Sequence, residues 1–234
     1  MELFFDDNFG ESQPVLNSNE SKHCIQVLRH KAGDVIKIIN GKGTLFSAAV
    51  IDANPKRCTL GNIESTFYPI NKSLLHIAIA PTKNNDRLEW FTEKATEIGI
   101  TAITPILCHH SERRHFKTDR LQKIVISAIK QSHQYHKPLI NDLIAFEKFI
   151  AVPFEGSKYI AHCINYIPKI NLANVCKNEL NCLILIGPEG DFSEKEVQLA
   201  LNNGFISVSL GESRLRTETA GVVACHTVRL MQEI

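Results

Sequence analysis

The first seventy residues alternate short apolar runs with tight turns and show little helical periodicity. The runs predict strands at residues 3–5, 35–39, 44–51 and 58–65. The segment Asn40-Gly-Lys-Gly43 separates two of these runs and is a strong hairpin signal. One helix is expected here, capped by Ser18 or Asn19 and ending near Gly33. Several short strands joined by tight turns predict a small β-barrel.

Beyond a linker at residues 68–73, strands and helices alternate. Apolar runs predict strands at residues 74–80, 100–107 and 159–163, and a 3.6-residue period predicts helices at residues 87–98 and from Asp119 onward. Residues 164–181 are the least regular stretch and are expected to form an exposed excursion. This alternation is typical of a mainly parallel sheet. The sequence therefore predicts two domains, residues 1–70 and 74–234.

Two segments of similar plan close the chain, and each predicts a strand, a sharp loop and a helix. In the first segment, residues 183–186 precede the loop Gly187-Pro-Glu-Gly190. Ser193 and Glu196 then have the spacing of a capping box, which predicts a helix that ends at Gly204.

In the second segment, residues 205–210 are predicted to form the strand, Gly211 turns the chain, and Thr217 or Thr219 caps a terminal helix. Open α/β sheets bind ligands beyond the carboxyl ends of their strands. We therefore expect the two loops to follow neighbouring strands and to lie side by side.

Composition limits the function classes. The chain is 44% hydrophobic and 22% charged, as is ordinary for a globular protein, and its net charge is +1. RNA contacts would therefore have to come from local basic clusters. The sequence shows neither a signal peptide nor an apolar run of membrane-spanning length, so no membrane association is expected. Seven cysteines without a Cys-x-x-Cys pair predict reduced thiols, a cytoplasmic location and no zinc site.

The two closing segments carry motifs that resemble the ribosomal RNA small subunit methyltransferase E family. Ile186-Gly-Pro-Glu-Gly190 is followed by Phe192, Ser193 and Glu196, and Leu210-Gly211 is followed by Leu215-Arg-Thr-Glu-Thr-Ala220. The resemblance implies a SPOUT-type, trefoil-knotted α/β domain with a mainly parallel sheet, preceded by a PUA-like β-barrel that contacts RNA. It also implies S-adenosylmethionine-dependent methylation of N3 of a uridine in 16S ribosomal RNA, and a homodimer.

Two departures from the family pattern stand out. Asp191 occupies a position where the family usually has a second glycine. Lys130 replaces an acidic residue before Gln131 and Ser132, and the arginine that usually follows is absent. Both departures make the local role of these positions an open question at this stage.

Site residues follow from the resemblance together with the chemistry. Glycine lets a backbone approach a ligand closely, and leucines can enclose an adenine ring. The expected cofactor-binding residues are Leu185, Gly187, Glu189, Gly190, Leu210, Gly211, Leu215, Thr217 and Thr219. Arg216 is the first candidate for a catalytic residue, and Arg114 is the second, because a guanidinium would stabilise negative charge on the uracil ring. No general base is identified; Glu189 and Glu218 are candidates for hydrogen bonding.

Basic residues gather in three places. The expected RNA contacts are His23, Arg29, His30 and Lys31 in the first helix, Lys83 and Arg87 after a strand, and Arg113 in the basic segment 108–123. For the first-helix group and for Lys83 and Arg87, a solvated surface explains the pattern equally well. His109, His110 and His115 lie close in sequence but do not have a recognised ligand spacing, so no metal is expected.

Two alternatives from other classes remain. The protein could be an RNA-binding ribosome assembly factor without catalysis. It could also bind a nucleotide with Gly187-Pro-Glu-Gly190 as a phosphate loop, although the usual glycine-rich fingerprints are missing. The terminal helix supports a dimer, because its apolar residues between Val222 and Met231 leave few polar faces.

Overall fold

The computed structural model describes residues 2–10, 14–70, 73–177 and 179–233. The chain forms two compact units, residues 1–70 with 126–137 and residues 71–125 with 138–234. The boundary thus falls inside helix α3 (Asp119–Ser132), which the sequence placed wholly in the second domain. Residues 71 and 72 of the expected linker lie outside the described residues.

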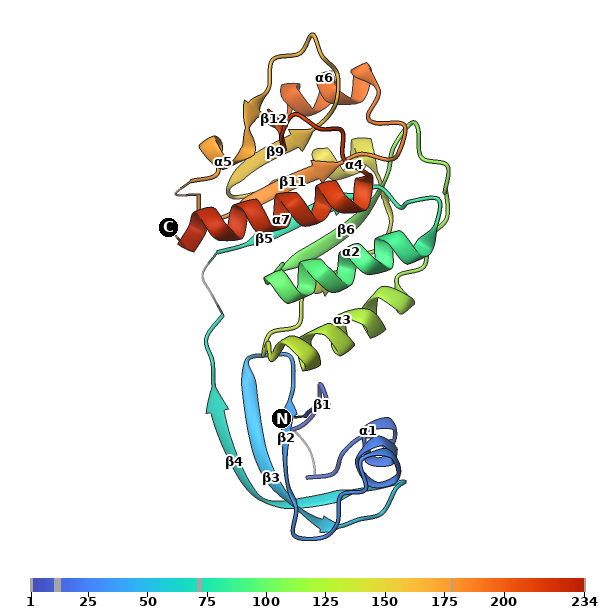
Figure 1. Ribbon diagram of the computed structural model, residues 1–234, viewed down its shortest axis with the longest axis vertical. Coiled ribbons are helices and arrows are strands. Elements are labelled where there is room, and N and C mark those ends of the chain that lie inside the picture. Colours follow the sequence, from blue (N-terminus) through green and yellow to red (C-terminus); the bar gives the residue numbers. More distant parts are fainter. Residues whose placement is uncertain (1, 11–13, 71–72, 178, 234) are drawn as a thin grey trace. The chain divides into compact units, whose positions relative to one another are not determined.

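The first unit contains a four-stranded sheet in the order β1-β2-β3-β4 (Figure 1). Its strands are β1 (Leu3–Phe5), β2 (Val35–Ile39), β3 (Thr44–Asp52) and β4 (Thr59–Phe67). The predicted hairpin is confirmed, since β2 and β3 pair antiparallel around residues 40–43. One face of this sheet holds an apolar core that includes Phe4, Ile38 and Phe46.

The first helix is shorter than predicted. Helix α1 (Ser18–Lys22) continues as one π-helical segment (His23–Val27). The cap is Asn17, not Ser18 or Asn19, because its side chain accepts a hydrogen bond from the backbone of Glu20. The prediction of an end near Gly33 is wrong. Arg29 has a left-handed backbone (φ 62°), and such a conformation cannot continue a right-handed helix.

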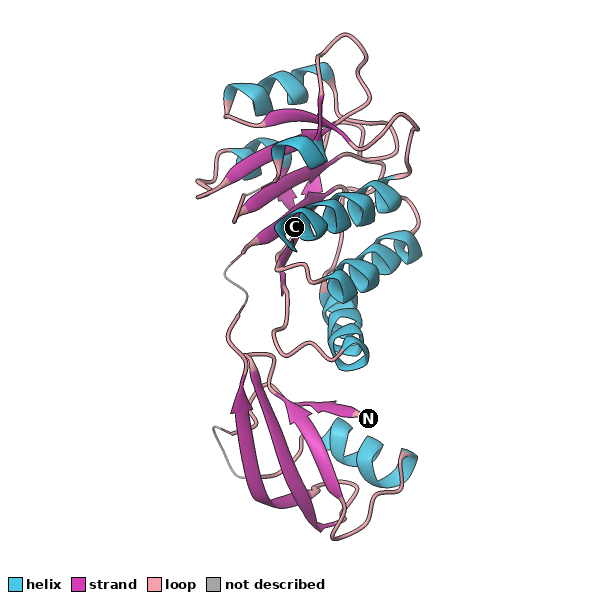
Figure 2. Cartoon of the chain, turned by 60° about the vertical axis from the view of Figure 1, so that its left-hand side comes forward, coloured by secondary structure: helices cyan, strands magenta, loops and turns pink. Residues whose placement is uncertain are grey.

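The second unit is an α/β fold around a parallel sheet, as predicted (Figure 2). The strand order is β10-β12-β9-β11-β5-β6-β7, with β8 paired to β6, and every strand pair described in this sheet is parallel. The strands are β5 (Leu75–Ile79), β6 (Ala102–Leu107), β7 (Leu139–Ile140), β8 (Ile144–Ala145), β9 (Ser157–Ala161), β10 (Ile170–Asn171), β11 (Cys182–Ile186) and β12 (Ile206–Ser209).

Helices cover both faces of this sheet. Helices α2 (Asn85–Ile98) and α7 (Thr217–Glu233) pack together, and α7 also contacts β5 and β11 (Figure 1). On the other face, α4 (Phe146–Ile150) and α6 (Glu194–Asn202) enclose an apolar core with Ala78, Leu183 and Leu185. The trefoil knot stays a prediction, because strand order and pairing do not describe how the chain is threaded.

Two predicted helix ends are correct, and the excursion is more ordered than expected. Gly99 ends α2 in a left-handed conformation (φ 100°), and Ser193 with Glu196 forms the predicted capping box at the start of α6. Residues 164–181, expected to be irregular, contain β10 and the short helix α5 (Leu172–Val175). The short elements β7, β8 and α4 had no prediction.

Candidate active site

Loops from three strands line one cavity of about 680 Å³ in the second unit, here called the loop cavity. The loops after β11 and β12 take part, as predicted, but their strands are not neighbours, because β9 lies between them. The loop after β9 therefore belongs to the site as well. The lining residues include His162, Cys163, Asn165 and Lys169 from that loop, Gly187, Pro188, Glu189 and Asp191 after β11, and residues 210–217 after β12.

The sequence reasoning missed the loop after β9. His162 is 7% exposed, and its Nε2 lies 2.9 Å from the Ser207 hydroxyl on the neighbouring strand β12. The backbone N–H of Ile164 donates to His162 Nδ1, so Nε2 carries the proton and donates to Ser207. Burial, and then the charge of Lys169, lower the pKa of His162 below its ordinary value. The available signal for this loop was the pair His162 and Asn165, which follow the apolar end of the strand in the sequence.

Hydrogen bonds hold the loops after β11 and β12 together. The Thr217 hydroxyl donates to the carbonyl of Gly187 at 3.0 Å, and this contact is buried. The Glu189 carboxylate accepts a hydrogen bond from the backbone N–H of Lys83, in the loop after β5. These contacts connect the start of α7 and two strand ends into one rim around the cavity.

Asp191 stands where the resemblance predicts a glycine, and its hydrogen bonds show how the aspartate is accommodated. Its backbone is left-handed (φ 64°), a conformation that glycine adopts freely and aspartate tolerates better than most residues. In return, Asp191 Oδ2 accepts from the Cys163 backbone N–H and Oδ1 accepts from the Phe192 backbone N–H, each at 2.8 Å. The carboxylate therefore fastens the loop after β9 to the loop after β11.

The basic segment lies beside these loops. Glu196, 5% exposed, accepts from the His109 backbone N–H as well as from Ser193, so the capping box of α6 also anchors this segment. Arg113 is half-buried and donates to the Lys83 carbonyl at 2.8 Å. Arg114 is exposed and is not among the residues that line the loop cavity.

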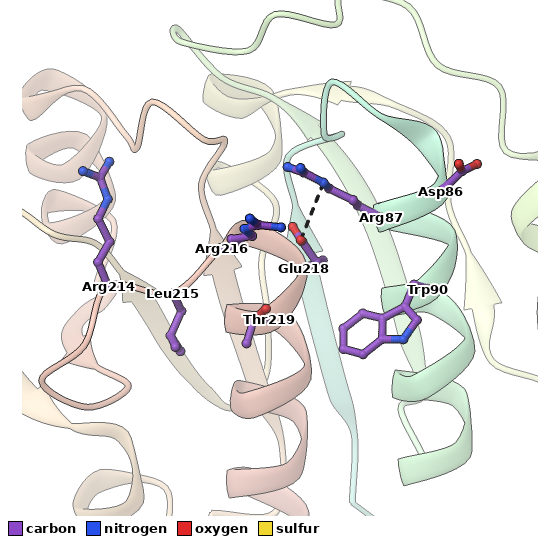
Figure 3. A pocket seen from close by; sticks show the side chains of 8 residues that line it. All are labelled: Asp86, Arg87, Trp90, Arg214, Leu215, Arg216, Glu218 and Thr219. Carbon is purple, nitrogen blue, oxygen red and sulfur yellow. Dashed lines mark ion pairs between the residues drawn. The ribbon is translucent and has the colours of Figure 1, made fainter.

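A second cavity of about 570 Å³, here called the Trp90 pocket, shares the wall Arg214, Leu215 and Arg216 with the loop cavity. The remaining lining residues are Asp86, Arg87 and Trp90 on α2, and Glu218 and Thr219 on α7 (Figure 3). Arg87 Nε lies 3.8 Å from Glu218 Oε1, and this ion pair connects the two helices across the pocket. Arg216 lines both cavities and is exposed, so its charge is available to ligands in either.

The expected cofactor-binding residues lie in four different places. Gly187, Glu189, Leu210, Gly211, Leu215 and Thr217 line the loop cavity. Thr219 lines the Trp90 pocket instead, and Leu185 is fully buried in β11. Gly190 faces the basic segment, because a Cβ added there would meet His110 Cβ at 3.0 Å.

In the first unit, two of the four expected RNA contacts lie against Phe4. The rings of His23 and His30 pack edge-on against Phe4, and His30 Nδ1 lies 3.2 Å from an Asp34 carboxylate oxygen. Arg29 and Lys31 are exposed. The side chains of the two histidines are therefore engaged within the unit, whereas Arg29 and Lys31 offer charge to the solvent.

The second departure is also explained within the first unit. Lys130 Nζ lies 2.7 Å from Glu20 Oε1, and both side chains are mostly buried. Glu20 also accepts from the Phe5 backbone N–H. The Ser132 hydroxyl donates to the Ala128 carbonyl of its own helix. A lysine therefore serves here as the partner of a buried acid.

The described residues contain neither a metal-binding cluster nor a membrane-spanning helix. Among residues 2–10, 14–70, 73–177 and 179–233, no group of three or more histidine, cysteine, aspartate or glutamate side chains is placed to hold a metal ion. Within the same ranges, no helix combines the length and apolar character needed to cross a membrane.

Comparisons with known proteins cover both units. The RNA methyltransferase domain family matches residues 70–229, and the RNA methyltransferase PUA domain family matches residues 16–61. Ribosomal RNA small subunit methyltransferase E of Buchnera aphidicola (subspecies Acyrthosiphon pisum) is 31% identical over 98% of this chain and 92% of its own length.

Two solved structures are similar over nearly the whole chain. A probable rRNA-methyltransferase from Porphyromonas gingivalis is 39% identical with a TM-score of 0.89, covering 98% of this chain and 99% of its own. A ribosomal RNA small subunit methyltransferase E from Neisseria gonorrhoeae, bound to S-adenosyl methionine, is 29% identical with a TM-score of 0.83, covering 98% and 97%.

Proposed function

Because the chain belongs to the ribosomal RNA small subunit methyltransferase E family, we propose that it methylates N3 of a uridine in 16S ribosomal RNA, with S-adenosylmethionine as the methyl donor. The observation that carries the proposal is the convergence of the loops after β9, β11 and β12 on one cavity of about 680 Å³. The similar Neisseria gonorrhoeae structure bound to S-adenosyl methionine supports this choice of cofactor.

The residues present fit such a cofactor. The loop cavity has the size of small-molecule sites, which typically enclose about 300–1,000 Å³. A Cβ built on Gly211 would meet no atom within 4 Å, so the backbone there borders open space. Gly187, Glu189, Leu210, Gly211, Leu215 and Thr217 would hold the cofactor. When bound, S-adenosylmethionine supplies an electrophilic methyl group.

The contribution of the protein is to position the base and to stabilise charge. Uridine becomes a nucleophile at N3 when it loses the N3 proton, and the negative charge then spreads over N3, O2 and O4. Arg216 offers an exposed guanidinium where the two cavities meet. Electrostatic stabilisation of this kind is worth on the order of 10²-fold in rate for a single donor. Arg114 is the weaker candidate, because it is not among the lining residues of either cavity.

RNA docking is proposed to involve both units. Arg29 and Lys31 with His23 and His30 would contact the phosphate backbone from the first unit, and Lys83, Arg87 and Arg113 would contact it from the second. Residues 1–70 would thus dock the RNA and residues 74–234 would carry out the transfer. We further propose a homodimer that acts in the cytoplasm on the small ribosomal subunit. A monomeric mass in light scattering at micromolar concentration would contradict the dimer.

Mass mapping of 16S ribosomal RNA from cells that lack and then regain the protein tests the function. The wild-type protein should restore one N3-methyluridine, whereas Gly211→Val should not, because it forces a branched residue into a left-handed backbone (φ 130°) at the cavity. RNA that is bound yet stays unmethylated would favour the assembly factor. Thermal shifts with nucleoside triphosphates but not with S-adenosylmethionine would favour the nucleotide-binding alternative.

Single-turnover rates at saturating RNA test the role of Arg216. Arg216→Ala should slow methyl transfer on the order of 10²-fold with little change in RNA affinity. Lys195→Ala, which removes an exposed charge on α6, serves as the control and should keep the wild-type rate. An Arg216→Ala variant that loses RNA affinity but keeps its saturated rate would contradict the catalytic assignment.

A further inference from the structure

The Trp90 pocket contains an exposed aromatic surface next to several positive charges. Trp90 is the only tryptophan in the chain, and it is 43% exposed on α2. Arg87, Arg214 and Arg216 line the same pocket (Figure 3). Aromatic rings and guanidinium groups together are the usual means by which proteins hold unpaired bases.

Glu218 places a carboxylate in this pocket to which the described residues offer an ion pair but no hydrogen bond for Oε2. Its side chain is only 9% exposed, and Oε1 lies 3.8 Å from Arg87 Nε, beyond hydrogen-bonding distance. Oε2 is buried and, among the described residues, finds no hydrogen-bond partner. An unpaired buried acceptor is costly, so a ligand that brings an N–H donor is favoured over one that brings a lone pair.

We propose that the Trp90 pocket binds an unpaired RNA base that offers a ring N–H next to a carbonyl group, as uracil and guanine do. The base stacks on Trp90, Arg216 donates to a carbonyl oxygen of the base, and Glu218 accepts the ring N–H. The terminal torsion of a glutamate is soft, so a rotation can turn Oε2 toward the base. Cytosine and adenine present a lone pair at the equivalent ring nitrogen, which the carboxylate repels.

This inference rests on the proposed function and adds base selectivity to it. The wall shared with the loop cavity, Arg214 to Arg216, places the bound base next to the cavity that would hold the methyl donor. Two nucleotides carry the required chemistry: the target uridine on its way to the donor, and a neighbouring uridine or guanosine. The experiment below separates these two sources.

The single tryptophan makes binding measurable without catalysis. Short single-stranded oligouridylate should quench Trp90 fluorescence and bind on the order of ten-fold more tightly than oligocytidylate at the same salt concentration. Oligonucleotides of N3-methyluridine, which lack the ring N–H, should bind as weakly as oligocytidylate. In the target RNA segment, N3-methyluridine is placed either at the modified position or at a neighbouring uridine. The placement that weakens binding identifies the nucleotide that occupies the pocket.

Variants separate base reading from general charge. Glu218→Gln should largely remove the preference for uridine over cytidine, because an amide can donate to the cytosine ring nitrogen. Glu93→Gln removes a carboxylate from an exposed ion pair on α2, the helix that carries Trp90, and should keep the preference. With a labelled oligonucleotide, Trp90→Ala should weaken binding on the order of ten-fold without changing the salt slope, and Trp90→Phe should retain most of the affinity.

Equal affinity of the folded wild-type protein for oligouridylate and oligocytidylate would overturn the inference. A Trp90 fluorescence intensity per protein that changes with the protein concentration but not with added RNA would also overturn it. Methyl transfer that persists unchanged in both Glu218→Gln and Trp90→Ala would also overturn it and leave the proposed function intact. A retained uridine preference without any binding of S-adenosylmethionine would instead contradict the proposed function alone.

Discussion

Substitutions of Asp191 can measure what a side chain contributes at a position where the resemblance to the family predicts glycine. The carboxylate makes two hydrogen bonds of 2.8 Å to backbone N–H groups, one of them to Cys163 in the loop after β9. The left-handed backbone (φ 64°) opposes these gains. Three variants separate the two effects: alanine removes the bonds and keeps the strain, glycine removes both, and asparagine keeps one acceptor oxygen.

The expected magnitudes follow from these contacts. Both bonds are partly exposed to solvent, so each should contribute about 1 kcal/mol, as a typical intramolecular hydrogen bond does and less than a buried bond to a charged group. A left-handed conformation costs an ordinary L-residue about 1–2 kcal/mol more than glycine. Asp191→Gly removes this strain, but the larger unfolded-state entropy of glycine offsets part of the gain. Asp191→Ala should therefore lower the free energy of unfolding by about 2 kcal/mol, and Asp191→Gly and Asp191→Asn by about 1 kcal/mol each.

Urea denaturation gives the stabilities, and calorimetry gives the affinity for S-adenosylmethionine. Because Asp191 fastens two loops that line the cavity, affinity should fall in the same order as stability. Glu212→Ala is the matched control, since it removes an exposed carboxylate that lines the same cavity. An alanine variant as stable as the glycine variant would refute the strain argument. Unchanged cofactor affinity in all three variants would refute the positioning role.

Three further predictions address other parts of the molecule. Arg113→Ala should weaken RNA binding and flatten its salt dependence in a salt-series titration, because fewer counterions are released; an unchanged slope would argue against a phosphate contact. Burial lowers the pKa of His76 to about 4. Since the unfolded state then binds the extra proton, stability should decrease as pH falls from about 6.5 to about 4, by about 3 kcal/mol in total, and pH-dependent denaturation of His76→Gln should lack this component. Gly221→Ala should destabilise the protein by about 1–3 kcal/mol in urea, because the added Cβ would lie 2.6 Å from the Phe91 ring; wild-type stability would mean that α2 and α7 separate easily at this point.

Local features of the fold were predictable because their causes are local. Asn40-Gly-Lys-Gly43 connects two antiparallel strands, Gly99 ends α2 in a left-handed conformation, and the capping box of Ser193 and Glu196 begins α6. Each depends on the backbone preference of a glycine or on hydrogen bonds between residues a few positions apart. The motif loops after β11 and β12 were also identified correctly as partners in one site, because parallel strands end at the same edge of a sheet.

The tertiary structure decided which further segments join that site. Sequence periodicity carries no information on strand order, so it could not show that β9 lies between β11 and β12 and brings His162 and Cys163 to the cavity. It could not show that Asp191 compensates its backbone strain through Cys163, 28 residues away. Trp90 and Glu218 line one pocket only because α2 packs against α7. Such juxtapositions arise from packing between distant segments, whereas turns and caps depend on neighbours in the chain.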